Sequence, residues 1–136
     1  MRQIKFRGYN AKNKQWLYGF YLQNRGAHFV CPDEFANGKS WEDYEVDPES
    51  VGQYTGLKDA NGKEIYEGDV IKLVDGTWKG VVTWHTDGYF YIDTSFGEDK
   101  LTTNHRPLGE MLKVVIDGER MYFEVTGNIY NKENEK

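Results

Sequence analysis

Apart from scattered carboxylates, only four side chains in this sequence are candidate metal ligands. They are one cysteine, Cys31, and three histidines, His28, His85 and His105. His28 and Cys31 have the spacing H-x-x-C, which is half of a zinc pattern. Residues three apart in a strand point to opposite faces, so we expect Cys31 to be a small buried apolar side chain instead. No helix N-terminus or strand-to-helix elbow is predicted after Cys31, so we do not expect it to act as a nucleophile.

The carboxylates Glu64, Glu67 and Asp69 lie close together in the sequence and form a second candidate for chemistry. A carboxylate pair or a divalent-cation site would use such residues. The last two flank a glycine, which is typical of a turn in which Asp69 accepts hydrogen bonds from backbone N–H groups. We favour this structural interpretation. An enzyme built around Gln53, Tyr54, Glu67 and Asp69 is the least favoured hypothesis, and we predict no catalytic residue, cofactor or metal.

Aromatic rings with nearby lysines form a third candidate, because such surfaces bind single-stranded nucleic acid by stacking. The residues concerned are Trp78, Trp84, Tyr89, Tyr91, Lys72 and Lys79. The alternative is that most of these rings form the core and its cross-strand pairs. We favour the core interpretation, because the surrounding sequence is acidic and phosphate affinity should be weak.

Charge is distributed unevenly along the chain, whose net charge is −5. Residues 1–32 carry six basic side chains and no acid, whereas the remaining 104 residues carry 11 basic and 22 acidic side chains. The six are Arg2, Lys5, Arg7, Lys12, Lys14 and Arg25. They are too widely spaced to resemble a nucleic-acid-binding tract. We expect this basic segment to dock on the acidic part of its own chain or to be a solvated strand.

The composition points to one soluble domain, or one domain with a small satellite, in 136 residues. A single cysteine excludes an intramolecular disulfide. The N-terminal residues lack the apolar core of a signal peptide, and no run approaches the roughly 18 apolar residues of a membrane span. We therefore expect a cytoplasmic protein without membrane contact.

Short aromatic or alternating runs separated by turn residues predict a mostly β protein. In the first 50 residues they predict a hairpin of strands 4–7 and 16–22 and a third strand, Ala27–Cys31. Residues 33–50 are predicted to be an acidic loop, with at most a short strand at residues 44–46. We expect residues 47–50 to lead straight into the next block rather than to form a helical turn.

The second part of the chain shows a turn signal about every ten residues, which is the rhythm of a meander or small barrel. Asn61-Gly62 is the strongest hairpin signal and requires positive φ. Strands are predicted at 70–74, 78–84, 89–92, 113–116 and 121–125, with turns at Asp75-Gly76, Asp87-Gly88 and Asp117-Gly118. The only helical turn is predicted within residues 105–112. The block 66–92 suggests an SH3-like barrel or meander, a prediction of fold and not of function.

The central run QYTGLKDANGKEIYEGDVIKL, residues 53–73, resembles the YopX-like family of phage and prophage proteins. The resemblance extends to the N-terminal IKFR, to residues 16–19, to DPESVG before the central run and to Gly127-Asn128-Ile129-Tyr130. Residues 75–78 and 97–121 depart from the pattern. The resemblance implies a predominantly β fold, a bacterial host and no established activity, so it supplies no catalytic residues.

We therefore predict three parts: residues 1–50, an N-terminal β-hairpin subdomain with an acidic loop; residues 51–130, a barrel-like or meander subdomain; and residues 131–136, a frayed tail. The block between the halves is predicted to be a structural joint or functional surface, comprising Gln53, Tyr54, Gly56, Leu57, Tyr66, Glu67 and Asp69. The predicted function is a non-enzymatic phage accessory module that binds a protein partner or self-associates. The alternative is a nucleic-acid-binding SH3-like barrel that uses the basic N-terminal segment.

Overall fold

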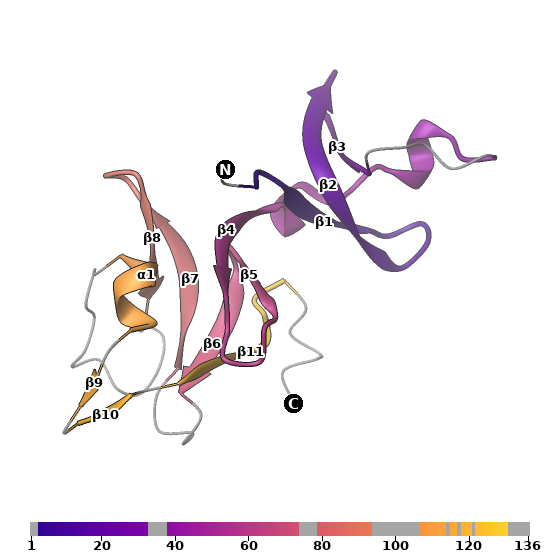
Figure 1. Cartoon of the computed structure of the whole chain (residues 1–136). Helices are drawn as coiled ribbons and strands as arrows, with labels where there is room; N and C mark the ends of the chain where they lie inside the picture. The colour runs from indigo at the N-terminus through magenta and orange to yellow at the C-terminus, as the bar shows by residue number, and fades with distance from the viewer. Residues whose placement is uncertain are drawn as a thin grey trace. The chain divides into compact units, whose positions relative to one another are not determined.

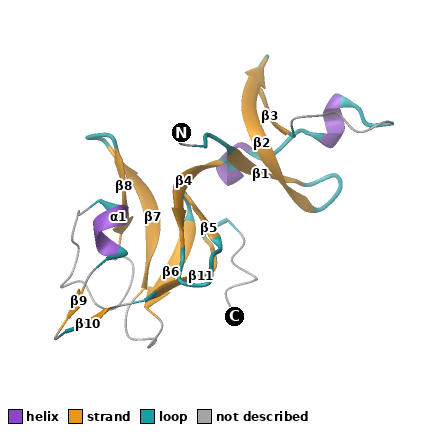
Figure 2. Ribbon diagram, in the orientation of Figure 1, coloured by secondary structure: helices purple, strands orange, loops and turns teal. Residues whose placement is uncertain are grey.

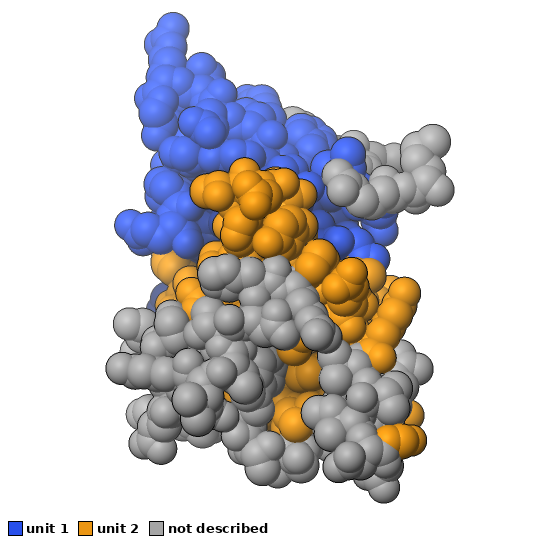
Figure 3. All heavy atoms as spheres, turned by 90° about the vertical axis from the view of Figure 1, so that its left-hand side faces the viewer, with its two compact units in different colours: residues 1–56 blue, residues 57–136 orange. Residues whose placement is uncertain are grey.

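The computed structural model describes residues 3–32, 38–73, 79–93, 107–113, 115–116, 118–120 and 122–130. The chain divides into two compact units, residues 1–56 and residues 57–136 (Figure 3). The sequence predicted a boundary between residues 50 and 51. The two units instead meet between Gly56 and Leu57, within strand β4 (Gly52–Lys58). The predicted tail at residues 131–136 lies outside the described residues.

Unit 1 is built on an antiparallel sheet in which the first strand pairs with a long strand on one side and with β4 on the other, where Phe6 lies opposite Gln53 (Figure 1). β1 (Phe6–Asn10) and β2 (Gln15–Asn24) form the predicted hairpin, shifted by a few residues. The second half of β2 pairs with β3 (Ala27–Cys31), which begins and ends where the sequence predicted. The change of partner occurs at Gly19. A Cβ atom there would lie 1.9 Å from the carbonyl oxygen of Cys31, so β3 approaches this closely only because residue 19 is glycine.

The segment after β3 connects β3 with β1, the strand on the other side of β2. It contains two short 3-10 helices, η1 (Trp41–Asp43) and η2 (Pro48–Ser50). Between them, the N–H of Val46 donates to the carbonyl oxygen of His28 at 2.9 Å, and the N–H of Asp47 donates to that of Tyr9 at 3.0 Å. One side of the segment is thereby bonded to β3 and the other to β1.

The prediction for residues 33–50 is confirmed in one point and wrong in another. An isolated antiparallel bridge between Phe29 and Glu45 matches the predicted short strand. Residues 47–50 were expected to lead straight into the next block, but they form the helical turn η2. In this turn the N–H of Ser50 donates a hydrogen bond to the carbonyl oxygen of Asp47 at 3.0 Å. Pro48 favours this turn because its φ is fixed at a helical value. Residues 33–37 lie outside the described residues.

Unit 2 contains a four-stranded antiparallel sheet in the order β11-β6-β7-β8 (Figure 2). Its strands are β6 (Asp69–Leu73), β7 (Lys79–His85), β8 (Tyr89–Asp93) and β11 (Phe123–Asn128). The mostly β fold and the meander of β6, β7 and β8 are confirmed. Within the described residues these strands do not close into a barrel, and the predicted turn at residues 75–76 lies outside them.

Side chains from five strands and the helix form the hydrophobic core of unit 2. They are Ile65, Ile71, Val82, Ile92, Leu108 and Phe123. The helix, α1 (Leu108–Met111), lies within the predicted range and begins directly after Pro107. It is short, yet it contributes Leu108, which is buried in this core. None of the described helices is long and apolar enough to cross a membrane.

The last predicted hairpin is wrong in its pairing. β9 (Val115–Ile116) pairs with β10 (Glu119–Arg120), not with the strand that contains Phe123. That strand, β11, pairs with β6, where Phe123 lies opposite Leu73. The physical reason is that Phe123 is buried in the core of unit 2. The apolar face of β6 is thus covered with the help of β11, a strand distant in sequence.

The turn between β4 and β5 (Glu64–Tyr66) is the hairpin turn that the sequence predicted most strongly. Gly62 has φ of +82°, as predicted, but Asn61 does not have positive φ. The carboxylate of Asp59 explains the difference, because its Oδ1 accepts hydrogen bonds from the N–H of Asn61 at 2.8 Å and of Lys63 at 2.9 Å. The Asp59 side chain thus fixes the first part of the turn, and only Gly62 needs the left-handed conformation.

Candidate functional site

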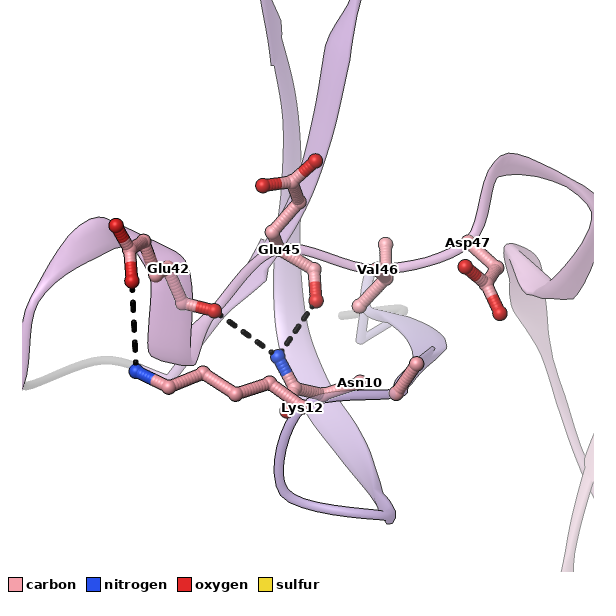
Figure 4. Close-up of a pocket in the computed structure, with 7 residues that line it drawn as sticks. Asn10, Lys12, Glu42, Glu45, Val46 and Asp47 are labelled. Atoms are coloured by element: carbon pink, nitrogen blue, oxygen red, sulfur yellow. Dashed lines mark hydrogen bonds and ion pairs between the residues drawn. The ribbon is translucent and has the colours of Figure 1, made fainter.

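A pocket of about 390 Å³ opens in unit 1 between the β1–β2 turn and the segment that follows β3 (Figure 4). It is lined by Asn10, Ala11, Lys12, Glu42, Glu45, Val46 and Asp47. Apart from Val46 and Ala11, the lining is polar or charged. The contacts of these polar groups decide whether the pocket is a binding site or a by-product of the way the segment is attached.

Asn10 is buried at the base of the pocket and bonds to three backbone groups. Its Nδ2 donates to the carbonyl oxygens of Glu45 at 2.7 Å and Glu42 at 3.2 Å, as Figure 4 shows. Its Oδ1 accepts from the N–H of Asn13 at 2.7 Å. The side chain therefore joins the β1–β2 turn to the acidic segment, and its hydrogen-bonding capacity is directed to the fold.

Asp43 lies beside the pocket and accepts hydrogen bonds from three nearby residues. Its carboxylate accepts from the backbone N–H of Ser40, from Asn13 Nδ2 and from Lys12 Nζ, at 3.0, 3.1 and 3.1 Å. These bonds, that of Ser40 first, hold the pKa of the Asp43 carboxyl well below its usual range. The bond to Asp43 correspondingly raises the pKa of Lys12, whose Nζ also lies 3.6 Å from a Glu42 oxygen.

The pocket thus holds carboxylates, one lysine and one amide, and most of these groups tie the segment to the hairpin. Its lining includes no histidine, cysteine, serine, threonine or tyrosine that could act as a nucleophile or an acid–base near neutral pH. The arrangement stabilises unit 1. We do not assign a reaction to it.

The structure places His28 and Cys31 in separate surroundings on β3. The ring of His28 stacks on Tyr21 with centroids 5.8 Å apart, and its Nδ1 is hydrogen-bonded to the Tyr21 hydroxyl. Cys31 is buried, and this burial raises the pKa of its thiol. A buried protonated thiol is a poor nucleophile. Within the described part of the chain, no group of three or more His, Cys, Asp and Glu side chains is arranged to hold a metal ion.

The candidate joint residues Gln53, Tyr54 and Gly56 belong to unit 1. The N–H of Tyr54 donates to the carbonyl oxygen of Lys5 at 2.8 Å, and Lys5 Nζ lies 5.2 Å from the centroid of the Tyr54 ring. The ring is buried, whereas Gln53 is half-buried. These contacts are those of a structural residue. The assignment of the block as a joint stays a prediction.

The other candidate joint residues, Leu57, Tyr66, Glu67 and Asp69, belong to unit 2. Leu57 packs against the hydrophobic core. The buried carboxylate of Asp69 accepts a hydrogen bond from the N–H of Tyr66 at 2.8 Å through Oδ2, which confirms the predicted turn. Glu67 is half-buried within that turn.

The residues considered for nucleic-acid stacking are partly brought together. Lys72 lies opposite Lys79, and Tyr89 and Tyr91 lie opposite His85 and Thr83, so these side chains share one face of the sheet. On it, Tyr89 stacks on His85 with ring centroids 4.5 Å apart. Trp84 lies on the opposite face against Phe90, at 4.8 Å. Trp78 lies outside the described residues.

Several side chains of the basic segment are engaged within unit 1. Lys12 bonds to Asp43 and Lys5 lies over Tyr54. Arg7 is buried, with its guanidinium carbon 5.1 Å from the centroid of the Trp16 ring. Lys14 and Arg25 occupy the two turns that flank β2, where both have positive φ. The predicted docking of basic residues on acidic ones is thus found at Lys12.

An aromatic face on unit 1 was not singled out from the sequence. Tyr18, Phe20 and Leu22 alternate along β2 and therefore point to one side. Phe29 lies directly opposite Leu22 in β3, and its ring centroid is 5.5 Å from that of Trp41. We call these five residues the aromatic face. Its three most accessible members are half exposed: Tyr18 at 49%, Phe20 at 50% and Trp41 at 52%.

The signal for this face was present in the sequence. Residues 16–22, WLYGFYL, contain no polar side chain apart from the tyrosine hydroxyls, although a strand with one solvated face normally alternates. A run without alternation implies that both faces carry apolar groups. Contiguous apolar patches on a protein surface mark interaction sites.

A family model described as YopX protein matches residues 5–134 of the chain. The chain belongs to the YopX family. The resemblance predicted from residues 53–73 is confirmed, and the match includes both units. No curated protein matches the sequence.

A solved structure resembles this YopX-family chain over its full length. It is the crystal structure of protein EF1440 from Enterococcus faecalis, which is 22% identical, with 100% of both chains covered and a TM-score of 0.55. At this identity the similarity concerns the fold alone. The functional conclusion therefore depends on the surfaces of the chain itself.

Proposed function

We propose that this YopX-family chain is a non-enzymatic protein-interaction module of a phage or prophage. It would act in the cytoplasm of the bacterial host and bind a protein partner through the aromatic face of unit 1. The observation that carries the proposal is the exposure of Tyr18, Phe20 and Trp41 on one side of that unit. Tyrosine and tryptophan are enriched among the residues that dominate binding energy at protein interfaces.

Charge around this face indicates the kind of partner. The segment from β1 to β3, residues 6–31, contains Arg7, Lys12, Lys14 and Arg25 and no acidic residue. Lys12 is paired with Asp43, and Arg7 is buried. Lys14 and Arg25 are left in the turns at the two ends of β2. Trp41, in contrast, lies in the acidic segment and is followed by Glu42 and Asp43. A partner that presents apolar side chains, with carboxylates toward the two turns of β2, complements such a surface.

Site-specific photo-crosslinking in bacteria that express the full chain tests this function. A photo-crosslinking phenylalanine analogue replaces Phe20 in one variant and Trp41 in another. The matched control carries the same analogue in place of Tyr122, which is equally exposed at 53% but belongs to unit 2. We expect positions 20 and 41 to capture the same protein, and position 122 not to capture it.

Binding by the purified partner provides the quantitative test. Phe20→Ser should weaken binding by about 30-fold, equivalent to about 2 kcal/mol for a central interface residue. Tyr122→Ser should leave binding unchanged. Crosslinks that do not differ between positions 20 and 122, or equal binding by the two serine variants, would contradict the proposal.

Nucleic-acid binding is the second candidate function, and one observation favours it: Lys72, Lys79, Tyr89 and Tyr91 share a sheet face. The net charge of −5 opposes it, because phosphate affinity depends on a surplus of cations. Titration of a fluorescent single-stranded oligonucleotide at low and high salt tests it. Affinity that falls with salt and is lost in Tyr91→Ala and Lys79→Ala would favour this function over the first.

A further inference from the structure

Asn61-Gly62, in the β4–β5 turn, is a dipeptide whose asparagine is chemically labile. The backbone nitrogen that follows an asparagine can attack its side-chain amide carbon, and a glycine at that position has no Cβ to hinder the attack. Both residues are exposed, and beyond the chain neighbours no atom lies within 4 Å of the position that a Cβ on Gly62 would take. The surroundings of the turn therefore do not block this reaction sterically.

Hydrogen bonds in the folded turn engage both of the groups that would react. The attacking nitrogen, that of Gly62, donates to the carbonyl oxygen of Asp59 at 3.0 Å. The amide that would be displaced, Asn61 Nδ2, lies 3.5 Å from Glu124 Oε2 on β11. The attack also requires the Gly62 nitrogen to lose its proton, and the nearby carboxylate of Asp59 disfavours the negative charge that results. The folded turn therefore protects Asn61.

Asp59 also attaches the turn to β11 (Figure 1). Its Oδ1 accepts from two N–H groups of the turn, and its Oδ2 accepts from the N–H of Val125 in β11 at 2.9 Å. Beside it, the N–H of Ala60 donates to the carbonyl oxygen of Phe123 at 2.9 Å. One carboxylate thus shapes the turn and holds it against β11, so the protection of Asn61 depends on this attachment.

In a detached turn the reaction is a substitution followed by a hydrolysis, with no change of oxidation state. A bond forms between the Gly62 nitrogen and Asn61 Cγ, the Cγ–Nδ2 bond breaks, and Nδ2 leaves as ammonia with the proton of the Gly62 N–H. Water then opens the cyclic imide. Cleavage of the new bond leaves aspartate at position 61, whereas cleavage of the original peptide bond leaves isoaspartate, whose main chain runs through Cγ.

We propose that Asn61 is a deamidation site that attachment of the turn to β11 keeps unreactive, and that the reaction makes detachment permanent. Aspartate at position 61 replaces the amide that faces Glu124 by a carboxylate, and the two like charges repel each other. Isoaspartate lengthens the main chain, so the N–H groups on either side of Gly62 no longer fit the same oxygen of Asp59. The site lies in unit 2 and does not depend on the aromatic face of unit 1.

Peptide mapping by mass spectrometry during incubation of the full chain near neutral pH tests the protection. The tetrapeptide Ala-Asn-Gly-Lys occurs at residues 36–39 and again at residues 60–63, so Asn37 in urea is an unprotected reference with the same neighbours. In native buffer, Asn61 should deamidate at least about tenfold more slowly than in urea, because only the detached fraction reacts.

Asp59→Ala should raise the native rate at Asn61 at least about tenfold, relative to the rate of the same variant in urea, because the turn loses the carboxylate that holds it. This change also lowers stability, so Ile71→Val is the matched control. It shortens a buried side chain in the core of unit 2 without touching the turn, and it should leave the rate at Asn61 unchanged.

Asn61→Asp reproduces one product and tests the consequence by amide hydrogen exchange. Exchange at Val125 should become at least about fivefold faster, whereas the amides of the internal strand β7 should not change. Adding Glu124→Gln removes the repelling charge and should restore part of the protection. Deamidation as fast in native buffer as in urea, equal native rates in Asp59→Ala and Ile71→Val, or unchanged exchange at Val125 in Asn61→Asp would overturn the proposal.

Discussion

The two units are both antiparallel sheets, but different interactions stabilise them. Unit 2 encloses a continuous cluster of aliphatic side chains with Phe123. Among the described residues, unit 1 buries fewer apolar side chains than unit 2. Unit 1 is held by polar side chains that bond to backbone: Asn10 to the acidic segment, and Ser50, whose Oγ accepts from the N–H of Tyr9 at 2.7 Å. Its aromatic residues remain in large part on the surface.

The difference shows that one small chain can place most of its apolar core in one unit and an exposed apolar surface in the other. Burial of apolar area contributes about 25 cal/mol per Å² to the stability of the fold. A unit that leaves aromatic rings exposed therefore gains less stability from burial. Buried hydrogen bonds contribute about 1 kcal/mol each, but the loss of one partner leaves a buried group unsatisfied. Unit 1 combines such bonds with an exposed apolar surface, which the proposed binding of a partner requires.

The largest contrast is expected from truncating one side chain in each unit. Ile71→Ala removes a fully buried side chain of unit 2 and should lower the free energy of unfolding by about 2–5 kcal/mol. Phe20→Ala removes a half-exposed ring of unit 1 and should lower it by less than about 1 kcal/mol. Urea unfolding of both variants measures the two values. Equal losses would contradict the comparison.

The polar attachment of unit 1 is tested by Asn10→Ala. This change leaves two carbonyl oxygens and one N–H without the amide that they bond to, and should lower the free energy of unfolding by about 1–3 kcal/mol. Asn24→Ala, at an exposed position of β2, is the control and should have little effect. If the two alanine variants were equally stable, Asn10 would not have the role assigned to it.

The β4–β5 turn allows a smaller and more local test. Gly62 has φ of +82°, with no atom within 4 Å of the position that a Cβ would take. Gly62→Val should therefore destabilise through backbone strain alone, by about 1 kcal/mol or more. Gly62→Asn should be milder, because asparagine tolerates this conformation. Thermal unfolding distinguishes them, and a valine variant as stable as the asparagine variant would argue against strain.

The smallest effect is expected from the titration of Asp43 in unit 1. Its pKa is lowered in the folded chain, so its contribution to stability is present above the unfolded value of about 3.9 and is lost as pH falls toward the folded pKa. Asp43→Asn should be less stable than the wild type at pH 7, with the difference shrinking in acid. Chemical unfolding between pH 7 and pH 2 measures it. A constant difference across this range would exclude the linkage.

Much of the local structure could be predicted from the residues themselves. The first hairpin, β3, the short helix before Leu112 and the turn closed by Asp69 all follow from alternation and turn chemistry in short stretches. Each of these features is decided by neighbours within about ten residues. The mostly β class follows in the same way.

Features that join distant residues could not be predicted. β11 pairs with β6 because Phe123 completes a core assembled from several strands and a helix, which no local pattern reveals. The same holds for Asp59, whose Oδ2 accepts from the N–H of Val125 at 2.9 Å, 66 positions along the chain. For the candidate surface, the run WLYGFYL supplied a signal, but its exposure depends on what covers each face.

The sequence by itself thus determined the class of fold, most turns and the family of this chain, because those properties reside in local spacing and in motif order. The tertiary structure alone decided which apolar residues are buried and which form a surface. Tyr18 and Phe20 are as apolar in sequence as Tyr54 and Phe123, yet the first two are half exposed and the second two are buried. Burial is a property of the packed neighbours of a side chain, and strand pairing, not composition, selects those neighbours.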